Sequence, residues 1–249
     1  MPELEHSHEP DAIQHRLDDG PRSSYLSDAI LGGIDGCVTT IAVVASVAGA
    51  GLPAMIAFVL GMASLVADAF SMGVSNYQAV KSQHDAREGL RHQEERHIEQ
   101  VPEGEREEVR IIFENKGFEG ETLERNVDTI TQDRRRWIDF MLQEEHGLPL
   151  QGPSPTKAGL ATFSVFILVG ALPLLPFLVP VLSDGGHFVA SAGMACVALF
   201  GIGYVKGMVL DMARWRTGLE TLLMGGGAAL VAFLFGYFLE PMLGDLRIS

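Results

Sequence analysis

Five long apolar stretches are the feature of this chain that most restricts its fold. They are Ala29–Leu52, Pro53–Tyr77, Ala158–Leu182, His187–Leu210 and Gly218–Leu239. Each holds at least about 20 residues, the length that a helix needs to cross the hydrocarbon core of a bilayer. A soluble protein would instead spread its apolar residues with a period of 3.6 or 2. The sequence therefore predicts an all-α, polytopic membrane protein with five transmembrane helices.

A hydrophilic insert, Lys81–Lys157, separates the second and third apolar stretches, and it holds 18 acidic and 12 basic residues. Pro102, Gly117 and Gly147 divide it, because proline is favoured at the start of a helix and glycine just past its end. The insert is therefore predicted to be a helical domain rather than a disordered loop. We expect three helices, at Ser82–Val101, at about Pro102–Asn115 and at about Glu121–His146.

These boundaries divide the chain into five parts: a flexible acidic N-terminal tail (1–28), two transmembrane helices (29–80), the insert (81–157), three transmembrane helices (158–240) and a C-terminal tail (241–249). Lysine and arginine are concentrated beside the insert and in the loop that holds Arg214 and Arg216. Cytoplasmic loops are enriched in these residues, so the N-terminus and the insert are predicted to be cytosolic. No organelle sorting signal is recognisable, which favours a prokaryotic cytoplasmic membrane.

Acidic residues inside the apolar stretches are the first candidates for function. Asp35 lies in the first stretch, where a carboxylate costs about 3 kcal/mol to insert. Asp68 and Met72 lie in the second stretch, four residues apart and hence on one helical face. Two acids and a thioether at membrane depth suggest a pathway for a metal cation. We therefore expect Asp35, Asp68 and Met72 to line a transport pathway.

The insert contains pairs of possible metal ligands at helical spacing. Residues three or four apart share a helical face, and facing helices that each supply such a pair can build a carboxylate metal site. A thioether beside a carboxylate suits a borderline transition metal better than Ca²⁺ or Mg²⁺. A solvated acidic surface is the alternative explanation for any one pair. The candidate ligands are Glu94 with His97, Glu105 with Glu108, and Met141 with Glu145.

Several short motifs, in this order, resemble the vacuolar iron transporter family. They are Asp35–Gly36, Ser71–Met72, Glu107–Val127, Trp137–Leu148 and Pro173–Leu178, and the resemblance covers roughly Asp28 to Phe238. It implies a five-span homodimer that moves Fe²⁺, and often Mn²⁺, out of the cytosol in exchange for protons. It also implies that Asp35 and Met72 bind the ion near the middle of the membrane, and that the insert residues named above collect it.

The chain departs from the family pattern at three positions. His97 stands where a glutamate is expected, and Leu142 stands where a second methionine is common. Asn76 stands where many members have a glutamate, so either Asp68 supplies the second acid or the entry path differs. Imidazole binds metal only when it is neutral, so the change at His97 predicts a pH-dependent affinity near neutral pH.

The expected function is therefore export of Fe²⁺, possibly also of Mn²⁺, by a transporter that is not an enzyme and holds no prosthetic group. Its expected partners are divalent metal ions, protons, the bilayer and a second copy of the chain, without nucleic acid. Two alternatives stay open. A membrane metal sensor without transport would explain the insert but not Asp35 and Asp68. A membrane di-iron enzyme is disfavoured, because such sites usually need many histidines clustered at helical spacing, and here only His92 and His97 come close to one another.

Overall fold

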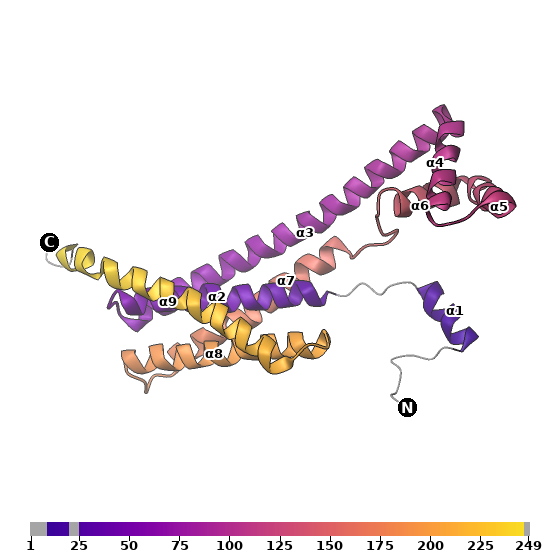
Figure 1. Cartoon of the computed structure of the whole chain (residues 1–249). Helices are drawn as coiled ribbons and strands as arrows, with labels where there is room; N and C mark the ends of the chain where they lie inside the picture. The colour runs from indigo at the N-terminus through magenta and orange to yellow at the C-terminus, as the bar shows by residue number, and fades with distance from the viewer. Residues whose placement is uncertain (1–8, 20–24, 247–249) are drawn as a thin grey trace. The chain divides into compact units, whose positions relative to one another are not determined.

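The computed structural model describes residues 9–19 and 25–246 of the chain (Figure 1). Within these residues every regular element is helical and no strand occurs, as the sequence predicts. The elements are α1 (Pro10–Asp19), α2 (Leu26–Gly49), α3 (Ala54–Gln100), α4 (Pro102–Asn115), α5 (Gly120–Thr131), α6 (Arg134–Glu144), α7 (Pro155–Gly170), the 3₁₀ helix η1 (Leu172–Leu178), α8 (Asp184–Val209) and α9 (Arg214–Leu246).

The chain divides into two compact units. The membrane unit comprises Met1–Tyr77 and Pro155–Ser249, and the insert unit comprises Gln78–Ser154. Helix α3 runs without interruption from the first unit into the second. Each unit is described below by itself.

Five segments of the described chain are long and apolar enough to cross a membrane: α2, the first part of α3, α7 with η1, α8 and α9. The prediction of five helices with the length and composition of membrane spans is thus confirmed. The third of them changes from α-helix to 3₁₀ helix at its end, where Pro173 and Pro176 lie. Proline has no N–H group to donate to the preceding turn, which explains this change. Apolar side chains such as Met224 and Val231 on α9 are exposed, as lipid contact requires.

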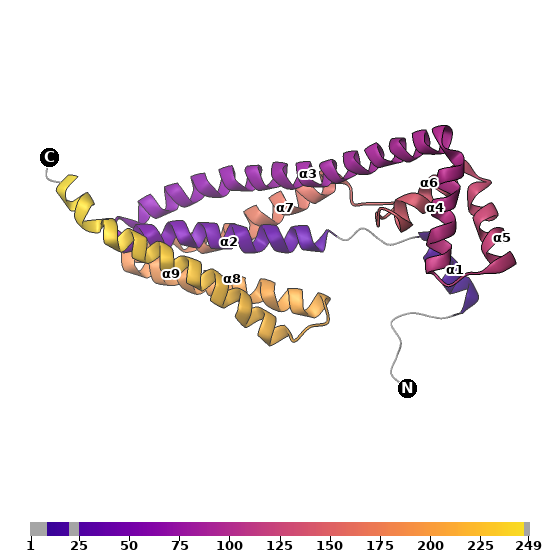
Figure 2. The same ribbon diagram turned by 45° about the horizontal axis from the view of Figure 1, so that its top comes forward.

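Helix α2 is the centre of the membrane unit, and α7, α8 and α9 pack around it (Figure 2). Glycines allow the backbones to approach closely. A Cβ atom added to Gly36 of α2 would lie 2.5 Å from the carbonyl oxygen of Phe166 on α7. One added to Gly49 would lie 2.1 Å from the carbonyl oxygen of Phe233 on α9. Small residues at such contacts are typical of membrane helix packing, which gains little from the hydrophobic effect.

The insert unit is built from the second part of α3 and from α4, α5 and α6. Its apolar core consists of Val109, Leu123, Val127, Trp137 and Met141. Leu123 and Val127 of this core lie on α5, Trp137 and Met141 lie on α6, and the partly buried Ile130 packs against them. The single helix predicted at about Glu121–His146 is wrong, because it is divided into α5 and α6.

The break between α5 and α6 lies at Gln132 and Asp133. Asp133 has an extended backbone, and its carboxylate accepts a hydrogen bond from the backbone N–H of Arg136 at 2.8 Å. This is an N-cap, which satisfies one of the free N–H groups at the start of a helix. An aspartate inside the expected helix therefore begins a new one instead.

Helix α1 lies in the segment that we expected to be a flexible acidic tail. Part of that segment is thus helical. The last residues of the expected tail, Leu26–Asp28, already belong to α2. Residues 1–8 and 20–24 fall outside the described residues, as does the end of the C-terminal tail at 247–249.

Candidate metal centre

Two groups of potential metal ligands in the insert unit share one carboxylate, that of Glu94. The first group is Glu94, Glu145 and His146, and the second is Glu94, His97 and Glu105. Within each group the ligand atoms lie within 4.8 Å of one another. Glu94 and His97 come from α3, Glu105 from α4, and the other two residues from the end of α6. At least one member of each predicted pair thus lies in these groups, which Glu94 joins.

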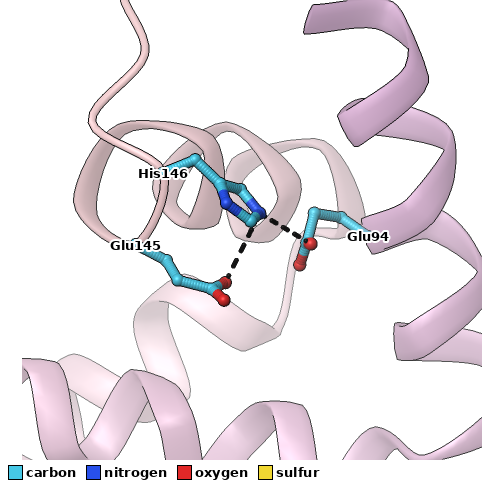
Figure 3. A group of neighbouring side chains, drawn as sticks. All are labelled: Glu94, Glu145 and His146. Carbon is cyan, nitrogen blue, oxygen red and sulfur yellow. Dashed lines mark hydrogen bonds and ion pairs between the residues drawn. The ribbon is translucent and has the colours of Figure 1, made fainter. Parts of the chain in front are cut away.

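The first group has short contacts between its side chains (Figure 3). The Nε2 atom of His146 lies 3.0 Å from Oε1 of Glu94 and 3.7 Å from Oε2 of Glu145. Figure 3 shows the imidazole between the two carboxylates, with one nitrogen directed at both. His146 was not among the residues predicted as ligands, and the structure identifies it as a further candidate ligand.

The end of α6 explains why two consecutive residues can serve the same group. On a regular helix, successive side chains point about 100° apart. Here the helix ends: the N–H of His146 donates to the carbonyl of Met141, and that of Leu148 donates to the carbonyl of Leu142. Gly147 has φ +64, a left-handed conformation that favours glycine. This turn lets the side chains of Glu145 and His146 face the same carboxylate.

The second group is held by the turn between α3 and α4. Nδ1 of His97 lies 3.2 Å from Oε1 of Glu105. Val101 separates the two helices, and Pro102 begins α4, where a missing N–H costs nothing. The pairing of His97 with a glutamate on the next helix is therefore a consequence of the helix boundary at Pro102, which the sequence did predict.

Two of these carboxylates are buried and incompletely bonded. Glu94 is 1% exposed and Glu105 is 4% exposed, and Oε2 of each lies buried without a hydrogen-bond partner. A buried carboxylate oxygen without a partner is costly, and buried charges are normally paired or bound to metal. The orphaned oxygens are therefore the clearest sign that the cluster is built for a cation.

The surface acids of the insert unit provide a contrast. Glu124 pairs with Arg110, Glu99 with Arg134, and Glu144 with Lys116. In the part of the chain that the structure describes, the ion-pair partners of Glu94, Glu105 and Glu145 are histidines only. The cluster thus differs from a solvated acidic surface, where lysine and arginine neutralise the carboxylates.

The electrostatics of the cluster favour uptake of positive charge. The pKa of Glu105 is raised to about 7, mainly by burial and also by the charges of Glu108 and Glu94, whereas His97 opposes them. Burial also raises the pKa of Glu145, against the effect of His146. A bound divalent cation would oppose both shifts, because it stabilises the charged form of the carboxylates and displaces the proton.

Glu108 and Met141, also predicted as ligands, are placed differently from the others. Glu108 is exposed, but its charge acts on both Glu105 and Glu145, so it lies beside the cluster. Met141 is fully buried in the apolar core, one turn before Glu145. Whether these two side chains bind metal stays a prediction.

The membrane unit contains the other predicted site residues. Asp35 on α2 lines a cavity of about 480 Å³ that is also lined by Lys206 of α8. Asp68 on α3 accepts a hydrogen bond from Ser64 at 2.6 Å and lies close enough to Asp35 for their charges to interact. Met72 packs against the apolar core of this unit. The position of Lys206 in the cavity of Asp35 was not predicted from the sequence.

Asn76, where the family pattern has a glutamate, forms a polar junction between three helices. Its Nδ2 donates to Oδ1 of Asp28 at 2.7 Å, to Oγ1 of Thr162 at 2.7 Å and to the carbonyl of Ala158 at 3.2 Å. These partners lie on α2 and α7. A carboxylate is therefore present at this place after all, but Asp28 rather than residue 76 supplies it.

Comparison with known proteins identifies the family of the chain. The model of the VIT family matches residues 26–237 of the chain. The chain belongs to the VIT family. It is 36% identical to vacuolar iron transporter 1 of Arabidopsis thaliana over 84% of this chain and 83% of the relative. It is 33% identical to the vacuolar iron transporter of Toxoplasma gondii over 89% of this chain and 76% of the relative.

A third relative, vacuolar iron transporter 1 of Eucalyptus grandis, is 34% identical over 88% of both chains. The matches extend across both units, so they are not limited to the apolar helices, which resemble one another in many membrane proteins. The resemblance that the sequence motifs suggested is thus confirmed. As a member of the VIT family with five apolar spans, the chain is a multi-pass membrane protein, and its relatives are named as transporters rather than enzymes.

Proposed function

We propose that this protein exports Fe²⁺ and similar divalent ions from the cytosol in exchange for protons, and that the insert unit collects the ion. The observation that carries the proposal is the cluster around Glu94, in which two buried carboxylates each keep an oxygen without a partner. Membership of the VIT family supports transport of a metal rather than mere binding.

In the collecting step, the insert cluster exchanges protons for a metal ion. Glu105 holds a proton for part of the time at neutral pH, because its pKa is about 7. An arriving cation displaces that proton and gains the two orphaned oxygens as ligands. The imidazoles of His97 and His146 add nitrogen ligands that suit Fe²⁺. Because a proton on Glu105 competes with the ion, acid opposes uptake.

In the transport step, Asp35 holds the ion in the membrane unit, and Asp68 and Met72 contribute to the same pathway. A thioether ligand favours Fe²⁺ and other borderline ions over the abundant hard cations Mg²⁺ and Ca²⁺. When the ion leaves, a proton on Asp35 removes the cost of an uncompensated charge in the membrane. Alternation of Asp35 between its metal-bound and protonated forms couples export to the return of protons.

The orientation of the chain follows from its basic residues. We place the N-terminus and the insert unit in the cytosol, because lysine and arginine are concentrated at those ends of the helices. The proposed membrane is the cytoplasmic membrane of a prokaryote, and the proposed assembly is a homodimer. This orientation puts the insert cluster on the side from which an exporter takes its ion.

The test is a flux assay with the purified protein in proteoliposomes. Uptake of Fe²⁺, Mn²⁺, Co²⁺ and Zn²⁺ is measured with and without a pH gradient across the membrane. The proposal predicts Fe²⁺ uptake that is faster when the inside of the vesicle is acidic. Absence of flux for all four ions, in protein that still binds them, would instead favour the non-transporting sensor.

A further inference from the structure

The two ligand groups of the insert unit have the same composition. Each contains one imidazole and two carboxylates, and Glu94 belongs to both. The imidazole of the first group, His146, is within hydrogen-bonding distance of Oε1 of Glu94. The other oxygen of Glu94, Oε2, has no partner. Glu105 repeats this arrangement, with Oε1 near His97 and Oε2 without a partner.

The distances between these atoms match those between ligands of one ion. Two ligand atoms that each lie about 2.1 Å from an ion, at an angle of about 90 to 109°, are about 3.0 to 3.4 Å apart. The contact of His146 with Glu94 measures 3.0 Å, and that of His97 with Glu105 measures 3.2 Å. An ion can therefore replace the proton in either contact with little movement of the side chains.

We propose that Glu94 bridges two adjacent metal ions, and that His97 and His146 make this pair of positions select imidazole-binding ions such as Fe²⁺, Co²⁺ and Zn²⁺ over Mn²⁺. This inference rests on the collecting role proposed above and specifies what that site binds. A carboxylate has two oxygens, so it can serve one ion with each, and bridged ions lie about 3.5 to 4 Å apart.

The selectivity follows from ligand chemistry. Carboxylate and water ligands suit Mn²⁺, Mg²⁺ and Ca²⁺, whereas imidazole suits zinc, iron, copper and nickel. A purely acidic cluster would hold Mn²⁺ well. One nitrogen ligand at each position shifts the preference towards the ions later in the first transition series. His146 thus acts as a specificity residue that the spacing of the acids along the helices does not reveal.

The experiment uses the purified full-length protein in detergent and titrates it with Co²⁺, alone and in competition with Mn²⁺. The variants are His146→Gln, His97→Gln and Glu94→Gln. The matched control is His92→Gln: His92 lies on the same helix and pairs with Glu88 and Glu95, but it is exposed and outside both groups. Circular dichroism checks that each variant keeps its helix content.

The wild type should bind two Co²⁺ ions that Glu94→Gln fails to bind, and electron paramagnetic resonance of the Mn²⁺-loaded protein should show a magnetically coupled pair. His146→Gln and His97→Gln should each reduce the preference for Co²⁺ over Mn²⁺ by about tenfold at one position, and His92→Gln should leave it unchanged. An unchanged preference in both histidine variants would overturn the proposed selectivity, and a single uncoupled ion would overturn the bridge.

A third result would show that the insert unit does not collect metal at all. The wild type and Glu94→Gln would then bind the same number of Co²⁺ ions with the same affinity. The insert cluster would then bind no metal, and this inference would fail together with the collecting step.

Discussion

Within its apolar helices the membrane unit holds few acidic side chains, such as Asp35 and Asp68, whereas the insert unit gathers two further carboxylates and two imidazoles around Glu94. The membrane unit gains its stability from close backbone contacts at glycines such as Gly36 and Gly49. The insert unit has an ordinary apolar core, and its cluster lies beside that core with two carboxylate oxygens left unbonded.

This difference shows how one chain can divide the handling of a metal ion. A cluster of carboxylates holds a divalent cation well, but a site within the membrane must also release it. In the proposed function, the few ligands of the membrane pathway, Asp35 with Asp68 and Met72, bind weakly enough to let the ion leave, and a proton on Asp35 then restores its neutrality. The two units therefore suit two steps, capture and passage, and a substitution in one should leave the other step largely intact.

The largest effect on stability is expected from Gly36→Leu, which breaks the membrane unit alone. The new side chain would collide with the backbone of Phe166 on α7, at a cost of about 3 kcal/mol or more. The melting temperature and the Fe²⁺ flux should both fall strongly, while Co²⁺ binding by the insert cluster persists. Gly193→Leu is the control, since a Cβ atom at Gly193 would meet nothing within 4 Å. Equal melting temperatures for the two variants would contradict the packing argument.

A smaller loss is expected from Asn76→Asp. The amide of Asn76 donates to Asp28, Thr162 and the carbonyl of Ala158, and an aspartate would replace this donor with a second acceptor. Leaving such groups unpaired costs about 1 to 3 kcal/mol, which differential scanning calorimetry of the purified protein would detect. Asn115→Asp, at an exposed position on α4, serves as the control. The junction would be unimportant if both variants melted like the wild type.

The pH dependence of metal binding gives the smallest effect. Because the pKa of Glu105 is about 7, metal must displace a proton below that pH, and the affinity for Co²⁺ should fall up to about tenfold from pH 7 to pH 6. Glu105→Gln should bind more weakly but with a flatter pH profile. Titration of both proteins at several pH values measures this, and parallel profiles would exclude Glu105 as the titrating ligand.

The raised pKa of Glu105 also makes the stability of the metal-free protein depend on pH. The pKa of Glu105 in the folded state exceeds its ordinary value of 4.5, so between about pH 4.5 and 7 the folded state binds more protons than the unfolded state. The insert unit should therefore lose stability as the pH rises through this range. Added metal should reverse that loss, because a ligand that binds only the folded state stabilises it.

The five spanning helices and the limits of α4 could be predicted because single local signals decide them: a long apolar run, or a proline at a helix start. The break before α6 could not, because Asp133 also fits inside a helical pattern. His146 was missed for a related reason. It follows Glu145 directly, and the rule that pairs residues three or four apart along a helix does not apply at a helix end.

The sequence also could not predict which acidic side chains are buried. Nothing in the local pattern distinguishes Glu94, which is buried and shared by both groups, from Glu95 on the same helix. The difference arises when α4 and α6 pack against α3 and cover one face of it. The position of Lys206 beside Asp35 likewise depends on how α8 packs against α2. Such contacts between distant segments decide which of many acids form a site.

The division between capture and passage is tested most directly by the dependence of proteoliposome flux on Fe²⁺ concentration. Three variants are compared with the wild type at equal protein density: Asp35→Asn, Glu94→Gln and, as a control outside both sites, Asp211→Asn. Asp35→Asn should abolish flux at every concentration. Glu94→Gln should raise the concentration for half-maximal flux and leave the maximal rate close to that of the wild type. Wild-type flux through Asp35→Asn would contradict the account.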